Sequence, residues 1–173
     1  AACLAKALKL NSTLSSFSIS GNRISDDGAA ALAEALTVNR TLTSFAAGEN
    51  QILDLGAQAL VEALKVNRHL TSINLDKIDI SGTGAQSLAD ALKANRHLTC
   101  ISLYDMKISA DGARALGEAL VINTTLIDVR LDDYFFETYD PSMDEKVEDA
   151  LGRNLRLRQK RIEMLTFLLG LGM

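Results

Sequence analysis

A 28-residue internal repeat constrains this sequence more than any other feature. A glycine recurs at this interval, and so does an Asn that stands three residues before a Leu. The positions are Gly28, Gly56, Gly84 and Gly112, then Asn11/Leu14, Asn39/Leu42, Asn67/Leu70, Asn95/Leu98 and Asn123/Leu126. Fixed periods of about 20–50 residues are typical of solenoids and other repeat architectures. The repeat therefore limits the fold class before composition is considered.

Each repeat has two halves with different periods. The first half, such as LTSINLDKIDI at Leu70–Ile80, alternates apolar and polar residues as a short strand does. The second half, such as DGAAALAEAL at Asp27–Leu36, carries its apolar residues on one helical face. A single strand–helix unit cannot bury its own apolar faces, whereas stacked units can. The sequence therefore predicts an α/β solenoid, with a curved parallel sheet on the concave side and helices outside.

Repeats of this length with a full helix resemble the ribonuclease-inhibitor-like class of leucine-rich repeats. The pattern GAxALAEALKVNRTLTSL is also similar to the repeat regions of NOD-like receptors. The sequence departs from the family at the ninth place of the repeat, where Asn22 and Asn50 are followed by Ile78, Met106 and Tyr134. We expect backbone hydrogen bonding at that turn to differ in the later repeats.

The two ends of the chain depart from the regular repeat. Residues 1–10 fit the second half of a repeat, so we interpret the chain as starting mid-repeat rather than with a targeting segment. After Phe136 the register slips by three residues. The sequence predicts leucine-rich repeats over 1–133 and a last helix with a cap over 134–173. Within the cap we expect a helix at about 142–152, and then a helical segment in place of the next strand.

The charges of this predicted cap are segregated. Acidic residues concentrate in 132–149 and basic residues in 153–161. An array closed by an aromatic segment, a helix and a basic run resembles the end of the leucine-rich-repeat domain of tropomodulin, an actin-filament capping module. The resemblance implies an alternative function, a regulator of cytoskeletal or GTPase machinery that acts through the cap or a repeat edge.

Composition narrows the partners. The net charge of -4 and the pI near 5.2 argue against a general affinity for nucleic acid. The apolar tail MLTFLLGLGM is too short to span a bilayer. We therefore expect a protein partner, no nucleic acid and no membrane. We also expect a cytoplasmic location, or a host cytoplasm if the chain is a pathogen effector.

The residues that suggest chemistry are explained better by the repeat. His69 and His97 share one register place, but zinc needs three or four ligands. His97 lies three residues before Cys100, at the entry of the strand rather than across from the thiol, so the two are not placed as a catalytic pair. Cys3 matches an interior helix position, and we expect no disulfide between the two cysteines. No catalytic residue, metal or cofactor is expected, and the chain is not predicted to be an enzyme.

Two repeated polar features each allow two interpretations. Arg40, Arg68 and Arg96 form a ladder that either binds an anionic surface or is solvated and pairs with nearby acids. Asn11, Asn39 and Asn123 begin glycosylation acceptor patterns. However, the repeat itself requires Asn just past each helix, where we expect the left-handed conformation.

The concave face is the most informative candidate surface. Its early repeats carry small neutral residues, while the later ones carry Asp, Tyr and Arg, and interface hot spots favour Tyr and Arg. We expect a protein partner to contact Asp76, Tyr104, Asp128, Arg130 and Asp132. The leading interpretation is a non-catalytic protein-interaction module of an intracellular receptor, scaffold or effector. Self-association through the exposed N-terminal end is a further prediction.

Overall fold

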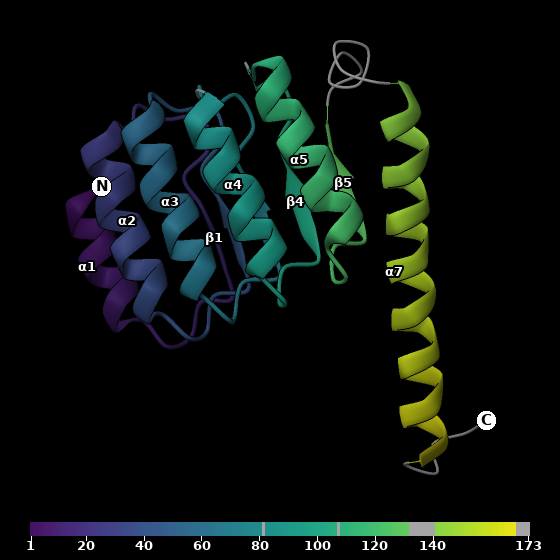
Figure 1. Cartoon of the computed structure of the whole chain (residues 1–173). Helices are drawn as coiled ribbons and strands as arrows, with labels where there is room; N and C mark the ends of the chain where they lie inside the picture. Colours follow the sequence, from purple (N-terminus) through teal and green to yellow (C-terminus); the bar gives the residue numbers. More distant parts are fainter. Residues whose placement is uncertain (81, 107, 132–140, 169–173) are drawn as a thin grey trace.

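The computed structural model describes residues 1–80, 82–106, 108–131 and 141–168. In this part of the chain, short strands and helices alternate, and five strands form one parallel sheet in the order β1-β2-β3-β4-β5 (Figure 1). The strands are β1 (Ser16–Ser18), β2 (Ser44–Ala46), β3 (Ser72–Asn74), β4 (Cys100–Ser102) and β5 (Asp128–Arg130). The helices are α1 (Ala2–Leu10), α2 (Asp26–Val38), α3 (Asp54–Val66), α4 (Gly82–Ala94), α5 (Ala110–Ile122) and α7 (Pro141–Leu168).

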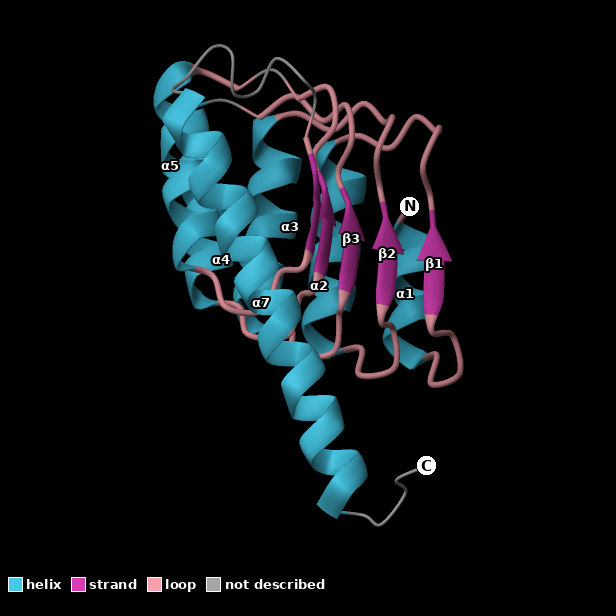
Figure 2. Ribbon diagram, turned by 90° about the vertical axis from the view of Figure 1, so that its right-hand side faces the viewer, coloured by secondary structure: helices cyan, strands magenta, loops and turns pink. Residues whose placement is uncertain are grey.

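The strand register follows the sequence repeat directly. Phe17 pairs with Phe45, and Ile73 pairs with Ile101, so partners in the sheet are 28 residues apart. The sheet lies on one side of the molecule and the helices on the other (Figure 2). The predicted α/β solenoid with its parallel sheet is confirmed. All strands point the same way, and a short turn connects the end of each helix from α1 to α5 to the next strand.

These turns between helix and strand all lie along one edge of the solenoid. They consist of residues 11–15, 39–43, 67–71, 95–99 and 123–127. We call this edge the lower edge, because it faces down in Figures 1 and 2.

The core lies between the sheet and the helices. Leu92 and Ile101 from these two layers are at most 1% exposed, as are their counterparts in the other inner repeats. Small residues let neighbouring helices approach closely. A Cβ atom on Gly56 would lie only 2.8 Å from the Cα of Asp26 in the preceding helix. The glycine that recurs in each repeat is therefore explained by packing.

A second repeated position adopts a left-handed backbone. Gly21, Glu49, Lys77 and Asp105, again 28 residues apart, have φ between 55° and 71°. In the second repeat the side chain of Asn50 ties this turn together by donating to the carbonyls of Ile19, Ala47 and Gly48. In the later repeats, apolar Ile78 and Met106 take that place and are buried. This agrees with the expectation that the turn is bonded differently there.

The repeated asparagines form a buried ladder along the lower edge. Asn95 accepts hydrogen bonds from the backbone N–H groups of His97 and Leu98, and its Nδ2 donates to the carbonyl of Leu64, each at 2.8 Å. The predicted left-handed conformation is wrong. Asn39 and Asn67, for example, are extended with φ of -69°, and the ladder of hydrogen bonds explains the regular spacing instead. Of the three glycosylation patterns, those at Asn39 and Asn123 start at side chains that are at most 3% exposed.

Helix α7 closes the described array. The two predicted helical segments form one continuous helix of 28 residues, about 42 Å long. Asn154 continues the ladder, because its Nδ2 donates to the carbonyls of Asn123 and Leu126. Figures 1 and 2 both show α7 extending beyond the lower edge. In the described residues, no helix combines the length and apolarity needed to cross a membrane.

Candidate functional site

The concave face contains a hydrogen-bonded cluster centred on Asp76. One carboxylate oxygen, Oδ1, accepts from the Ser102 hydroxyl at 2.6 Å and from the Tyr104 backbone N–H at 2.8 Å. The other oxygen, Oδ2, accepts from the side-chain amide of Asn74 at 2.5 Å. Asp76 therefore links strands β3 and β4 and holds the backbone of Tyr104 in place. The sequence pattern predicted Asp76 as a contact residue and did not reveal this internal role.

Tyr104 and the residues of β5 extend this cluster. Tyr104 is 51% exposed just after β4. The side chains of Arg130 and Asp128, on β5, are 71% and 47% exposed, with Arg130 Nε 4.0 Å from Asp128 Oδ2. Four of the five predicted contact residues thus lie on three adjacent strands or just after them. The fifth, Asp132, lies outside the described residues.

Cys100 occupies a half-buried position on the same face. Its thiol donates to Asp128 Oδ2 at 3.1 Å. Burial, and then this hydrogen bond, raise the pKa of the Cys100 thiol above its ordinary value. A nucleophilic cysteine needs the opposite shift, because the thiolate is the reactive species. The arrangement therefore favours the protonated form of Cys100, which is unreactive as a nucleophile.

The other residues that could suggest catalysis or metal binding do not lie together in a site. His69 and His97 are exposed on the lower edge, and each donates its backbone N–H to the ladder asparagine two residues before it. Among the described residues, no group of three or more His, Cys, Asp or Glu side chains is placed to hold a metal ion. Both cysteines are free. The predicted interior position of Cys3 is wrong, because this side chain is exposed.

The lower edge carries features that the sequence only partly revealed. Arg40, Arg68 and Arg96 are exposed there. A cavity of about 220 Å³ lies between Arg40 and Arg68, and a larger one of about 770 Å³ opens where α7 passes the edge. The larger cavity was not predicted, because it depends on how α7 packs against the last turns. One signal for it in the sequence was Leu157, an apolar residue within the basic run 153–161 that lines this cavity.

Comparisons with known proteins agree with this fold. A family model described as a leucine-rich repeat matches residues 10–33 and 66–89. The structure of the leiomodin-1 actin-binding site 2 is similar with a TM-score of 0.83 and 25% identity, over 95% of each chain. The C-terminal domain of Caenorhabditis elegans tropomodulin is similar with a TM-score of 0.78 and 18% identity, over 93% of this chain and 97% of that one.

The comparisons also bear on the resemblances inferred from sequence. Comparison with curated protein sequences gives no significant match. The likeness to tropomodulin, inferred from the last 40 residues of the sequence, extends in three dimensions over nearly the whole chain. The similarity to NOD-like receptors stays a prediction, as does the ribonuclease-inhibitor-like subtype. The 28-residue register, the parallel sheet and these matches show that the chain has the fold of a leucine-rich-repeat solenoid.

Proposed function

We propose that this chain is a non-catalytic protein-binding module, and that the later repeats of its concave face form the docking surface. The observation that carries the proposal is the exposed Tyr104, whose backbone is held by Asp76 beside the exposed Arg130. Tyr and Arg are the residue types that most often supply binding energy at interfaces. An anchor that is already ordered loses less conformational entropy when a partner binds.

Actin is the first partner to test. Its support is the likeness to the actin-binding site 2 of leiomodin-1, which covers 95% of this chain and includes 25% identical residues. The likeness to tropomodulin supports the fold. Neither match identifies the surface that would contact actin, so partner and surface need separate tests.

The partner is tested by co-sedimentation of the chain with actin filaments and by its effect on filament elongation. Binding to actin supports the proposal that actin is the partner, whereas unchanged elongation together with no co-sedimentation contradicts it. The result leaves the concave-face proposal to its own experiment, since a different protein can dock there.

The surface is tested with the double variant Tyr104→Ala/Arg130→Ala. We expect its affinity for actin, or for another protein captured by the wild-type chain, to fall at least about tenfold. The matched control Leu55→Ala/Arg114→Ala removes an exposed apolar side chain and an exposed Arg from the helical side. It should change the affinity by less than about twofold. Equal losses in the two double variants, or none in either, would rule out the concave face as the docking surface.

A further inference from the structure

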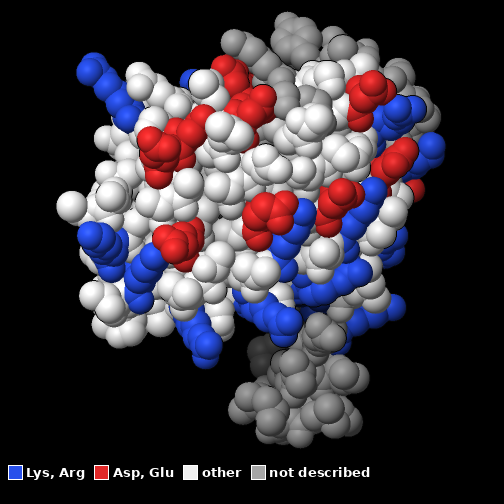
Figure 3. Space-filling view, turned by 60° about the vertical axis from the view of Figure 1, so that its left-hand side comes forward, with Lys and Arg blue, Asp and Glu red and all other residues white. Residues whose placement is uncertain are grey.

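The arginine ladder carries positive charge along the lower edge without acidic partners in the described part of the chain. Among the described residues, Arg40, Arg68 and Arg96 make no ion pair, and Arg96 only donates a long hydrogen bond of 3.4 Å to the hydroxyl of Thr124. The lysines near the helix ends differ, because each has an acidic partner: Lys9 with Glu34, Lys65 with Glu62 and Lys93 with Asp90. Lys and Arg side chains gather toward the lower edge in Figure 3, and most acids lie above them.

The spacing expected for the ladder suits an extended peptide. Neighbouring strands lie about 4.7–4.9 Å apart, and packed helices about 8–10 Å apart. The arginines stand in the turns between these two layers, so their step lies between the two spacings. Side chains on one face of an extended segment repeat every two residues, or about 6.6 Å. Carboxylates at alternating positions of such a segment would therefore meet successive arginines.

An apolar row accompanies the ladder. The last residues of α1 to α5 share one register place, where Val38, Val66 and Ile122 are 53–57% exposed and α4 carries the smaller Ala94. Val66 also lines the smaller cavity together with Arg40 and Arg68. A segment that alternates acidic and apolar residues presents its two kinds of side chain to opposite sides. It would match a surface where cations and apolar side chains run in parallel rows.

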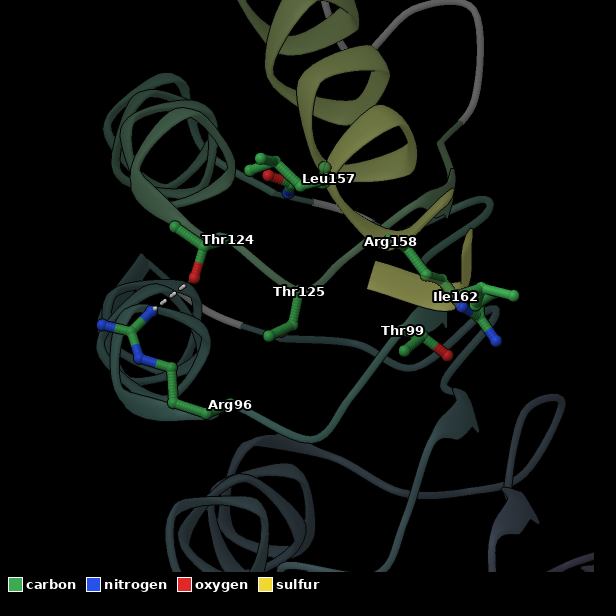
Figure 4. A pocket seen from close by; sticks show the side chains of 8 residues that line it. Arg96, Thr99, Thr124, Thr125, Leu157, Arg158 and Ile162 are labelled. Atoms are coloured by element: carbon green, nitrogen blue, oxygen red, sulfur yellow. Dashed lines mark hydrogen bonds between the residues drawn. The ribbon is translucent and has the colours of Figure 1, made fainter. Parts of the chain in front are cut away.

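Helix α7 ends this track with the larger cavity. Arg96 and Arg158 line it from different elements, and Thr99, Thr125 and Leu157 contribute hydroxyl and apolar surface (Figure 4). Leu157 is 54% exposed, and Arg158 forms no ion pair within the part of the chain that the structure describes. The cavity thus adds a further cation and an apolar wall at the point where the projecting helix blocks the edge.

We propose that the lower edge binds an acidic, extended segment of another protein. Alternating carboxylates face Arg40, Arg68 and Arg96, and an apolar side chain enters the cavity beside Leu157. This surface is separate from the concave face, so the inference does not rest on Tyr104 and Arg130.

The probe is a fluorescein-labelled peptide, Gly-Glu-Val-Glu-Val-Glu-Leu-Gly, and the readout is fluorescence anisotropy with the full chain. We expect binding that weakens with salt, and a loss of at least about tenfold in the variant Arg68→Glu/Arg96→Glu. The control Arg23→Glu/Arg114→Glu makes the same charge change away from the lower edge and should stay within about twofold. Leu157→Ala should lower the affinity for this peptide. It should not change the affinity for a version of the peptide that lacks the Leu. Tyr104→Ala/Arg130→Ala should bind it normally.

Several results would overturn the inference. One is equal affinity for a peptide with its three Glu residues contiguous, or with Gln in place of Glu. Another is equal affinity for an oligothymidylate or for phosphatidylserine-containing vesicles, which would reveal a general attraction for polyanions. A third is equal peptide binding by the ladder variant and the control. Circular dichroism melting, and the milder Arg68→Ala/Arg96→Ala, separate a lost contact from a lost fold.

Discussion

The buried asparagines show how one side chain can serve three pieces of backbone. Asn95 is 4% exposed, accepts from two N–H groups and donates to a carbonyl of the preceding repeat. Asn11 has the same place in the first repeat and accepts from Thr13 and Leu14, but these hydrogen bonds are exposed. The two positions therefore differ in whether water can replace the side chain.

Asn95→Ala should lower the free energy of unfolding by about 3 kcal/mol, because it leaves buried backbone groups without partners. Asn11→Ala should lower it by less than about 1 kcal/mol, since water can reach the same groups. Urea unfolding monitored by circular dichroism measures both. Similar losses for the two variants would mean that the ladder does not act through burial.

Cys100 and Asp128 give a second test on single side chains. Because the native state raises the pKa of this thiol, it holds the proton more tightly than the unfolded chain does. The resulting stabilisation is present below the ordinary thiol pKa and is lost as the pH rises through the raised value.

Iodoacetamide should therefore modify Cys100 more slowly than the exposed Cys3 at mildly alkaline pH, as followed by peptide mass spectrometry. Asp128→Asn should speed the reaction at Cys100, because it removes the negative charge that favours the protonated thiol over the thiolate. Asp105→Asn, an exposed acid after β4, is the control and should leave the rate unchanged. A faster reaction at Cys100 than at Cys3 would contradict the assigned environment.

The helices keep the sheet in place through a narrow apolar face. Leu92 of α4 is 1% exposed and lies between the helical layer and the strands. Leu55, in the first turn of α3, is 73% exposed on the outer side. The two leucines therefore test whether burial, rather than residue type, determines the contribution to stability.

Leu92→Ala should lower the free energy of unfolding by about 2–5 kcal/mol, the usual range for a buried Leu→Ala change. Leu55→Ala should change it by less than about 0.5 kcal/mol. Thermal and urea unfolding of both variants decide the point. A loss below about 0.5 kcal/mol for Leu92→Ala would mean that the inner face of α4 is misassigned.

The molecule as a whole behaves as a stack in which each repeat contacts its neighbours. Helices pack along the series from α1 to α5, and α7 packs against α5. Arg153 strengthens this closure, since its guanidinium donates to the carbonyls of Val121 and Asn123 at the end of α5. Disturbance at one end should therefore spread only partway along the array.

Asn154→Ala tests this one-dimensional character. We expect faster hydrogen exchange in β5 and the end of α5, and unchanged exchange in α1 and α2, because the bonds that Asn154 makes to the preceding repeat end at Asn123 and Leu126. Exchange followed by mass spectrometry gives the profile. A uniform increase along the chain would indicate a single cooperative unit.

The division at residue 133 and self-association through the N-terminal end stay predictions. The observation that bears on self-association lies in the first repeat. There Leu4 and Leu14 are 45% and 43% exposed, although their places in the repeat are apolar. A measurement of molecular mass against concentration checks the self-association, and Leu4→Glu should reduce it.

The sequence by itself determined the solenoid, because a 28-residue period of apolar residues leaves stacking as the way to bury them. It also determined which residues become neighbours in the sheet, since matching places in successive repeats pair, as Cys100 does with Asp128 and Ser102 with Arg130.

Only the tertiary structure decided what the polar residues bond to. The carboxylate of Asp76 is occupied by its own chain, the asparagines are extended rather than left-handed, and α7 runs past the lower edge to form a cavity with Arg96. A periodic pattern specifies which side chains are buried. The partners of a hydrogen bond depend on distances between repeats, and those exist only once the repeats have stacked.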